Sequence, residues 1–349
     1  MKNNQIRSIK YNFVMNLILT ASNFLFPLIT FPYVSRVLQV EANGIIAYVT
    51  SIVSYFSLVA SLGIPTYGIR AAATVRDDKR KLSKVVQELL IINIVLVGFV
   101  LIIYFIMLFT VPSMLVYSEL FYINAIGIIL NVLGVNWFFQ AIEQYDYITV
   151  RSIIFRVLSI ALMFIFVHQP SDYIIYGLIL VLSSAGSNIL NFKRLFKYIT
   201  LKKQDKYEFV PHFKPILILF AQSLVISIYT NLDLIMLGSI KDSYEVGLYT
   251  AATKLKLILL SVVNSLGNVL LPRMSYYVRR NMKEQFERVM AQALNFTLFI
   301  SLPLAIFFTL NANESLLILA GEQYLGAVLS MQFLTIAVIP IGITGVLGI

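Results

Sequence analysis

The sequence predicts an all-α protein that crosses a membrane many times. Of its 349 residues, 59% are hydrophobic and only 13% are charged, and the mean hydropathy is +0.83. Soluble domains carry about 25% charged residues, and a soluble chain of this length could not bury so much apolar surface. The apolar runs are too long for strands and lack strict alternation. Helices also satisfy their own backbone hydrogen bonds within a bilayer.

Ten apolar runs are long enough for a helix to cross a membrane. The first contains Pro27 and Pro32, which predict a kink because proline removes a backbone donor. It is too long for the apolar core of a signal peptide, so we expect it to remain as the first helix. The runs cover about 11–37, 44–64, 86–110, 115–139, 147–167, 173–195, 215–238, 246–271, 287–310 and 324–349.

The basic residues predict the orientation of these helices. With the N-terminus inside, all but four of the 27 Lys and Arg residues fall on the inner side. Arg36 and Lys241 fall outside, and Lys254 and Lys256 lie within the bilayer. This bias satisfies the positive-inside rule and predicts a multi-pass protein with both ends of the chain cytoplasmic. It also accounts for the net charge of +10 without nucleic acid as a partner.

An internal repeat predicts two lobes. Gly44 opens the second run and Arg70 closes its inner end, and Gly247 and Arg273 flank the eighth run at the same interval. A basic loop and another apolar run follow each, so the repeats point the same way through the membrane. We expect a six-helix N-terminal lobe over 1–200 and a C-terminal lobe over 201–349 with four helices. Because the sequence ends within or just after a helix, we expect the second bundle to be truncated.

Charged residues inside the apolar runs are the first candidates for function. Asp233 precedes a polar hairpin at 239–245, and Lys254 and Lys256 follow it, so the acid and the first base lie at similar depth. Arg156 lies near the middle of the fifth run. A charge at the bilayer centre costs at least about 2.5–3.5 kcal/mol, so such residues normally face a cavity or one another.

Polar stripes with helical spacing accompany these charges. Small polar residues also join helices, and for serine and threonine alone the two interpretations are equally good. Asparagines beside an acid and a base favour a water-filled lumen. At the helix ends and inner mouth, a lipid head group and a substrate are both reasonable partners. The polar lumen candidates are Asn12, Asn16, Asn23 and Asn231, with Thr20 in the same stripe, and the inner-mouth candidates are Arg70, Arg151 and Arg273.

The sequence lacks several signatures of enzymes. No Walker A, Asp-x-Asp or His-Glu-x-x-His pattern is present, and no outer loop is long enough for a catalytic domain. Cysteine is absent, and the two histidines, His168 and His212, are interpreted as incidental polar residues. We therefore expect a protein that is not an enzyme and uses neither a cofactor nor a metal.

Three segments resemble the Wzx-type polysaccharide flippases of the multidrug/oligosaccharidyl-lipid/polysaccharide exporter superfamily. They are FPYVSRVLQVEANGIIAYVTSIVSYFSLVASLGIPTYGIR at 31–70, WFFQAIEQYDYITVRSIIFR at 137–156 and NLDLIMLGSIKDSYEVGLYTAATKLK at 231–256. The resemblance implies two helical bundles of the multidrug-exporter type around a central cavity, in a bacterial cytoplasmic membrane. Family members usually have twelve or more helices. The resemblance puts the family's basic lumen residues at Arg36, Arg156, Lys254 and Lys256, with Asp233 as an acidic partner.

The resemblance also implies a substrate, namely oligosaccharide repeat units on polyprenyl pyrophosphate for capsule, O-antigen or exopolysaccharide synthesis. Its partners would be this lipid-linked oligosaccharide, membrane lipids and a polysaccharide polymerase. We expect alternating access driven by an ion gradient, with Asp233 as a candidate protonation site. One alternative is a drug/cation antiporter of the same superfamily, which would want acids rather than bases in its cavity. Another is a membrane-embedded lipid-sugar polymerase, which would want a large outer loop.

Overall fold

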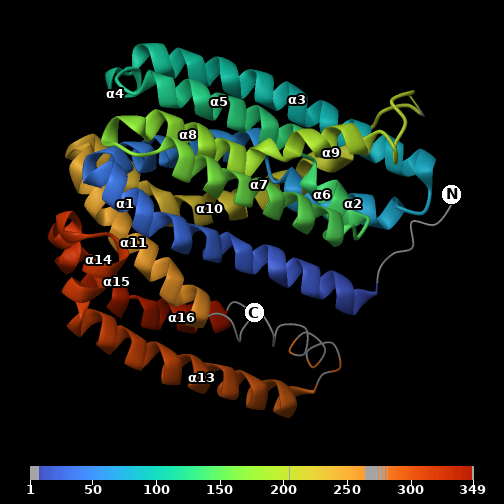
Figure 1. Cartoon of the computed structure of the whole chain (residues 1–349). Coiled ribbons are helices and arrows are strands. Elements are labelled where there is room, and N and C mark those ends of the chain that lie inside the picture. The colour runs from blue at the N-terminus through green and yellow to red at the C-terminus, as the bar shows by residue number, and fades with distance from the viewer. Residues whose placement is uncertain are drawn as a thin grey trace. The chain divides into compact units, whose positions relative to one another are not determined.

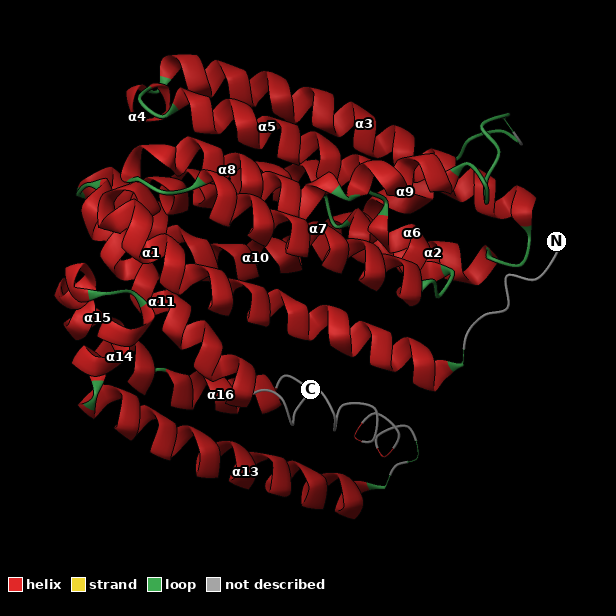
Figure 2. Cartoon of the chain, viewed as in Figure 1, coloured by secondary structure: helices red, strands yellow, loops and turns green. Residues whose placement is uncertain are grey.

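The computed structural model describes residues 8–203, 205–263, 274, 277, 280 and 282–347. Within these residues every regular element is a helix, as Figure 2 shows. Nine stretches of the described residues are long and apolar enough to cross a membrane. The prediction of an all-α polytopic membrane protein is therefore confirmed.

The helices follow the predicted apolar runs closely (Figure 1). The α-helices are α1 (Ile9–Ser61), α2 (Ile64–Val75), α3 (Lys79–Thr110), α4 (Pro112–Leu115), α5 (Ser118–Leu133), α6 (Asn136–Ala141), α7 (Tyr145–Phe166), α8 (Tyr173–Val181), α9 (Asn188–Leu195), α10 (Val210–Ile240), α11 (Ser243–Val263), α13 (Lys283–Leu310), α14 (Ala312–Leu319), α15 (Val328–Ile336) and α16 (Val338–Leu347). The other helical segments of the described residues are the 3₁₀ turns η1 (Pro170–Asp172) and η3 (Glu322–Ala327) and the π-helical turn η2 (Leu182–Gly186).

The first two predicted runs form one long element, α1, with an interruption at Gln39. This residue has a φ of 64°, which a helix cannot accommodate. Pro27 and Pro32 lie within the helical backbone of α1, and the kink predicted at them stays a prediction. The interruption is stabilised by side chains, because Asn43 and the hydroxyl of Tyr324 both donate to the carbonyl of Gln39, at 2.8 and 3.0 Å.

Contacts divide the chain into two compact units. Unit 1 comprises Met1–Phe26 and Ile45–Ser243, and unit 2 comprises Pro27–Gly44 and Tyr244–Ile349. These bounds differ from the predicted lobes over 1–200 and 201–349, because α10 packs on α2 and belongs to unit 1. The two lobes of the repeat remain a prediction.

The core of unit 1 is built around the aromatic residues of α6. Trp137, Phe138 and Phe139 are buried, and the rings of Phe138 and Phe139 meet edge to face at 5.2 Å. Leu89 of α3 packs in the same cluster. Gly68 lets α2 approach, because a Cβ there would lie 2.6 Å from the indole of Trp137.

The second half of α1 runs antiparallel to α10 within unit 1. Near the start of this half of α1, a Cβ on Gly238 would meet the ring of Tyr48. About two turns further along α1, the hydroxyl of Tyr55 donates to the carbonyl of Ser227 at 3.2 Å. At the end of α1, Gly63 approaches the backbone of Ile216. Residue numbers thus rise on one helix as they fall on the other, which fixes the antiparallel direction.

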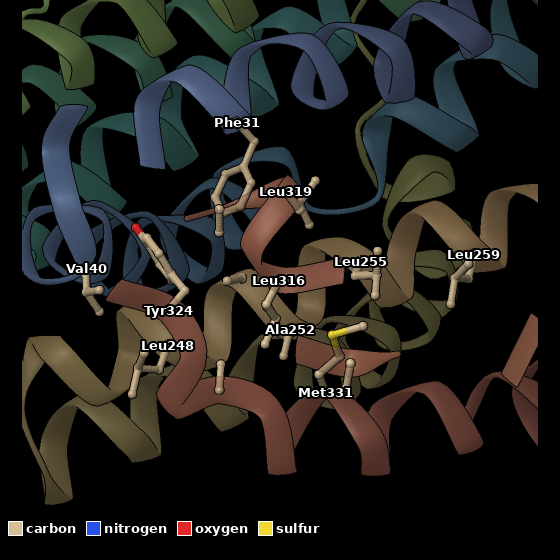
Figure 3. Close-up of a cluster of buried hydrophobic side chains, with 14 of the residues drawn as sticks. Phe31, Val40, Leu248, Ala252, Leu255, Leu259, Leu316, Leu319, Tyr324 and Met331 are labelled. Carbon is tan, nitrogen blue, oxygen red and sulfur yellow. The ribbon is translucent and has the colours of Figure 1, made fainter. Parts of the chain in front are cut away.

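The core of unit 2 gathers around α11, as Figure 3 shows. Leu248, Ala252, Leu255 and Leu259 recur at helical spacing and form its apolar face. Phe31 and Val40 of α1 pack on this face. From the other elements come Leu316 and Leu319 of α14, Tyr324 of η3 and Met331 of α15. Burial of this face is what fixes residues 27–44 in unit 2.

Candidate functional site

In unit 1 the first half of α1 lies along α7 in the same direction. The hydroxyl of Thr149 donates to the carbonyl of Met15 at 2.9 Å. About two turns further along both helices, Arg156 donates to Ser22. Because the same step separates the contacts on each helix, the two helices are parallel, and the side of α1 that carries Ser22 faces α7.

Arg156 lies at the middle of α7, roughly 15 Å from either end. Its guanidinium donates to Ser22 Oγ and Asn23 Oδ1, and it lies over the ring of Phe26 at 5.8 Å. The side chain is half-buried. Each of these partners is neutral, so they orient the cation without neutralising it. Two residues that were predicted separately, Arg156 and Asn23, are thus in contact.

The hydroxyl groups of the polar stripes donate mainly to their own helices. Ser54 donates to the carbonyl of Ser51 at 2.7 Å, Ser223 to Leu219 at 3.0 Å and Thr250 to Val246 at 2.7 Å. A hydroxyl whose hydrogen is used in this way keeps its lone pairs. Ser54 and Ser223, which are half-buried, therefore offer acceptors rather than donors to a ligand, whereas Thr250 is buried.

Glu143 joins three segments at one end of unit 1. Its carboxylate accepts from Arg76 at 2.6 Å and from Asn12 at 3.3 Å. Its φ of 56° is unusual for a residue with a side chain, so the turn between α6 and α7 is strained. Asn12 was predicted to face a lumen, and in the structure its amide donates to the carboxylate of this ion pair. Neither Glu143 nor Arg76 was predicted, although an acid at the junction of two apolar runs is a signal for such a role.

Arg151 is buried, with 5% of its surface exposed. It donates to the carbonyl of Ser187 and to Asn136 Oδ1, each at 2.8 Å. Asn191 donates to the same Asn136 oxygen at 2.8 Å, which extends the network to α9. Arg151 therefore joins α7 to α6 and to the start of α9. Its predicted inner-mouth role stays a prediction.

On α10 the predicted polar residues are half-buried. Asn231 donates to Thr230 Oγ1 at 3.1 Å and to the carbonyl of Ser227 at 3.4 Å. Asp233 accepts from the backbone N–H of Leu234 at 2.9 Å. α10 buries little of its surface, since His212 and Ile216 are its fully buried residues in the described part.

In unit 2, Arg36 interacts with the C-terminus of α14. Its guanidinium donates to the carbonyls of Leu317 and Ile318 at 3.0 and 2.7 Å. The last carbonyls of a helix lack intrahelical partners and carry the negative end of its dipole, so a cation there is stabilising. The exposed Arg36 side chain also lines an open hollow of about 790 Å³ with Leu317, Gly321, Glu322 and Gln323.

Lys254 and Lys256 lie on α11 in unit 2, and both are half-buried. Each residue turns a helix by about 100°, so the two lysines project roughly 200° apart. They flank Leu255, which packs in the core of unit 2. The two side chains are therefore on opposite flanks of α11 rather than in one row.

The other predicted residues are placed as follows. Asn16 and Arg70 are exposed, on α1 and α2. Arg273 lies outside the described residues. Over the described part of the chain, no three metal-ligating side chains gather in one group.

Comparison with known proteins gives two family matches. A model described as "Polysaccharide biosynthesis protein" matches residues 9–278, which is most of the chain. A second model, MatE, matches residues 219–348. No solved structure matches the chain.

Two curated proteins are similar to the chain. A "Putative O-antigen transporter" of Escherichia coli K12 is 27% identical over 274 residues, covering 77% of this chain and 65% of that protein. The protein of the same name from Shigella dysenteriae is 26% identical over 276 residues, covering 76% of this chain and 67% of that protein. The chain thus spans about two thirds of the length of these relatives.

Proposed function

This chain belongs to the family of polysaccharide biosynthesis proteins, and on that premise we propose that it transports polysaccharide repeat units across the bacterial cytoplasmic membrane. The substrate of this proposal is an oligosaccharide linked to polyprenyl pyrophosphate. The relatives named as O-antigen transporters support the polysaccharide part of the proposal. Both ends of the chain are proposed to be cytoplasmic, from the distribution of basic residues.

The observation that carries the proposal is the environment of the Arg156 side chain. A cation lies at the middle of a membrane-spanning helix, half-buried, and among the described residues it donates to a hydroxyl and an amide rather than to a carboxylate. Holding a charge there is costly, and such residues usually serve function. A pyrophosphate would supply the missing negative charge. At a separation of about 4 Å, each charge pair contributes about 4 kcal/mol at an effective dielectric constant of 20.

The polar stripes suit the sugar part of this substrate. Sugars carry many O–H donors, and the half-buried hydroxyls of Ser54 and Ser223 retain acceptor lone pairs. We therefore assign the anionic head group to the arginine and lysine side chains and the sugar to the hydroxyl stripes. The polyprenyl tail remains in the lipid, where its apolar surface needs no protein cavity. Membrane lipids and a polysaccharide polymerase are the partners we propose.

The other predicted site residues are proposed to bind the head group, to couple transport to an ion, or to lie at the mouths of the passage. Lys254 is the second cation for the head group, and Lys256, on the other flank of α11, serves only if that flank faces the passage. Asp233 is the candidate for ion coupling, because it is the acid within the membrane-spanning part of α10. Arg36 is proposed as a further cation for the head group, and Arg70 and Arg273 are proposed to lie at the inner mouth of the passage. Arg151, which is buried, is proposed to support that mouth by holding α6, α7 and α9 together. Alternating access driven by an ion gradient is the mechanism we propose.

A drug/cation antiporter is the second candidate, and the MatE match over residues 219–348 favours it. Such a protein needs acids to attract cations, whereas the membrane-spanning candidates here are mainly bases. A test with a cationic dye separates the two, since an antiporter would export the dye and a flippase would not.

Reconstituted transport tests the proposal directly. Arg156→Ala and Lys254→Ala are expected to reduce flipping of the lipid-linked oligosaccharide at least about tenfold each, because each removes a charge partner worth more than 1.4 kcal/mol. Lys241→Ala, in the exposed hairpin between α10 and α11, is the matched control and should retain transport. Undiminished flipping in both lumen variants would refute the cationic passage.

A further inference from the structure

A strongly basic surface lies at one end of unit 1, where three candidate membrane spans begin or end. These spans are Lys79–Thr110, Pro170–Leu195 and Val210–Ile240. The start of α3 meets the linker between α9 and α10 there (Figure 1). We call it the basic surface of unit 1. Its exposed basic residues are Lys79, Arg80 and Lys81 of α3 and Lys197, Lys202, Lys203 and Lys206 of the linker.

Side chains of α3 hold the first half of the linker, although the two segments are far apart in the chain. Ser83 Oγ accepts from the backbone N–H of Thr200 at 3.2 Å. Gln87 Nε2 donates to the carbonyls of Thr200 and Lys202. The linker is therefore attached through its backbone, which leaves the lysine side chains directed away from these contacts.

The second half of the linker is attached to the same helix. Tyr207 donates to Gln87 Oε1 at 2.9 Å, and the backbone N–H of Glu208 donates to Glu88 Oε1 at 2.7 Å. His212 Nε2 lies 3.0 Å from the other oxygen of Glu88, so this histidine, interpreted from the sequence as incidental, helps to attach the first turn of α10. These contacts bring the lysines of the linker beside the basic residues of α3.

Acids balance only part of the positive charge of this surface. Residues 77–84 and 197–208 contain eight basic and four acidic side chains, so their net charge is +4. Three of the acids, Asp78, Asp205 and Glu208, form ion pairs at 3.4 to 3.9 Å. The positive-inside rule acts on each loop separately. It therefore explains the sign of the charge but not why two distant loops join into one surface.

A large apolar side chain projects from the same surface. Leu201 is 68% exposed, and the carbonyls on either side of it, those of Thr200 and Lys202, both accept from Gln87. Because the backbone is held on both sides of Leu201, the fold imposes the exposure of its side chain. Apolar residues beside lysines are typical of segments that insert into the head-group region of a bilayer.

We propose that the basic surface of unit 1 binds the head groups of anionic phospholipids, with Leu201 inserted at the boundary of their acyl chains. Each basic residue near an anionic membrane surface raises the affinity roughly fivefold. A neutral lipid lacks this attraction, and a soluble polyanion has no apolar layer for Leu201. The inference deepens the membrane-lipid part of the proposed function, and it rests on that function only for placing this surface on the cytoplasmic side.

The absence of cysteine from the chain allows a probe to be attached at one position. Leu201→Cys carries a nitroxide spin label, and the protein is placed in nanodiscs of phosphatidylcholine alone or mixed with phosphatidylglycerol. Collisions of the label with oxygen, which concentrates in lipid, are compared with those of a neutral, water-soluble nickel complex. Phosphatidylglycerol should raise the ratio of oxygen to nickel collisions at least about fivefold. A label at His168→Cys, in the exposed turn before η1, is the matched control and should show no such rise.

Charge variants test whether the lysines cause this response. Combined with Leu201→Cys, the changes Lys202→Gln, Lys203→Gln and Lys206→Gln should remove most of it, whereas replacing the same three lysines by arginine should keep it. An equal response in the glutamine variant, or no response with all lysines present, would overturn the proposal. Protection of the label by heparin but not by phosphatidylglycerol would overturn it as well, in favour of a soluble polyanion. The readout contains no transport step, so its failure and a failure of the proposed transport are separate results.

Discussion

Replacing Gly247 by alanine should destabilise unit 2 strongly. A Cβ at this position would lie 2.0 Å from the carbonyl oxygen of Val40 and 2.8 Å from its carbonyl carbon. Both are backbone atoms, so no side-chain rotation relieves the clash, and residues 27–44 must move away from α11. Overpacking usually costs about 1–3 kcal/mol. Because the backbone cannot give way here, we expect about 3 kcal/mol or more.

Gly98 provides the matched control for this change. It lies within α3, and a Cβ there meets nothing within 4 Å. Gly98→Ala should be neutral or stabilise the protein by up to about 1 kcal/mol, because alanine favours the helix. Unfolding in mixed micelles, followed by far-UV circular dichroism, gives the free energy of unfolding of both variants. If Gly247→Ala unfolds at the same detergent composition as Gly98→Ala, the packing of residues 27–44 on α11 is wrong.

Three further changes test individual contacts by the same unfolding measurement. Tyr324→Phe removes the donor to the carbonyl of Gln39 and should cost about 1–2 kcal/mol, and a cost near zero would contradict that contact. Arg36→Gln should cost about 0.5–1 kcal/mol through the lost cap on α14, with the loss reduced by high salt; salt-independent stability would argue against it. Arg151→Ala should cost about 2–4 kcal/mol, and Arg151→Lys should restore less than half, because lysine lacks the planar fork; full rescue by lysine would show that charge alone matters.

The sequence alone predicted the helices well because length and apolar composition decide whether a segment spans a membrane. It placed the break between the first two runs near Gln39, and the kink expected at Pro27 and Pro32 stays a prediction. The break depends on Asn43 and Tyr324, and Tyr324 is too far along the chain for local pattern to reveal.

The candidate site was predicted in part. Arg156 near mid-depth followed from its position in an apolar run, and Asn23 followed from the stripe. That Ser22 also accepts from the guanidinium of Arg156 depends on the register between α1 and α7. Register is set by contacts between segments that are distant in the chain, so the local pattern of one sequence does not predict it. The burial of Arg151 among amides and of His212 beside Glu88 was missed for the same reason.

Whether Arg156 holds an anionic head group is tested most directly by comparing how strongly the protein binds polyprenyl pyrophosphate and the corresponding polyprenyl alcohol. Both lipids are bound to the protein in nanodiscs and quantified by native mass spectrometry. The unmodified protein and Lys241→Gln should prefer the pyrophosphate by at least about tenfold, Arg156→Lys should keep part of this preference, and Arg156→Gln should lose it. An unchanged preference in Arg156→Gln would contradict the proposed role of Arg156.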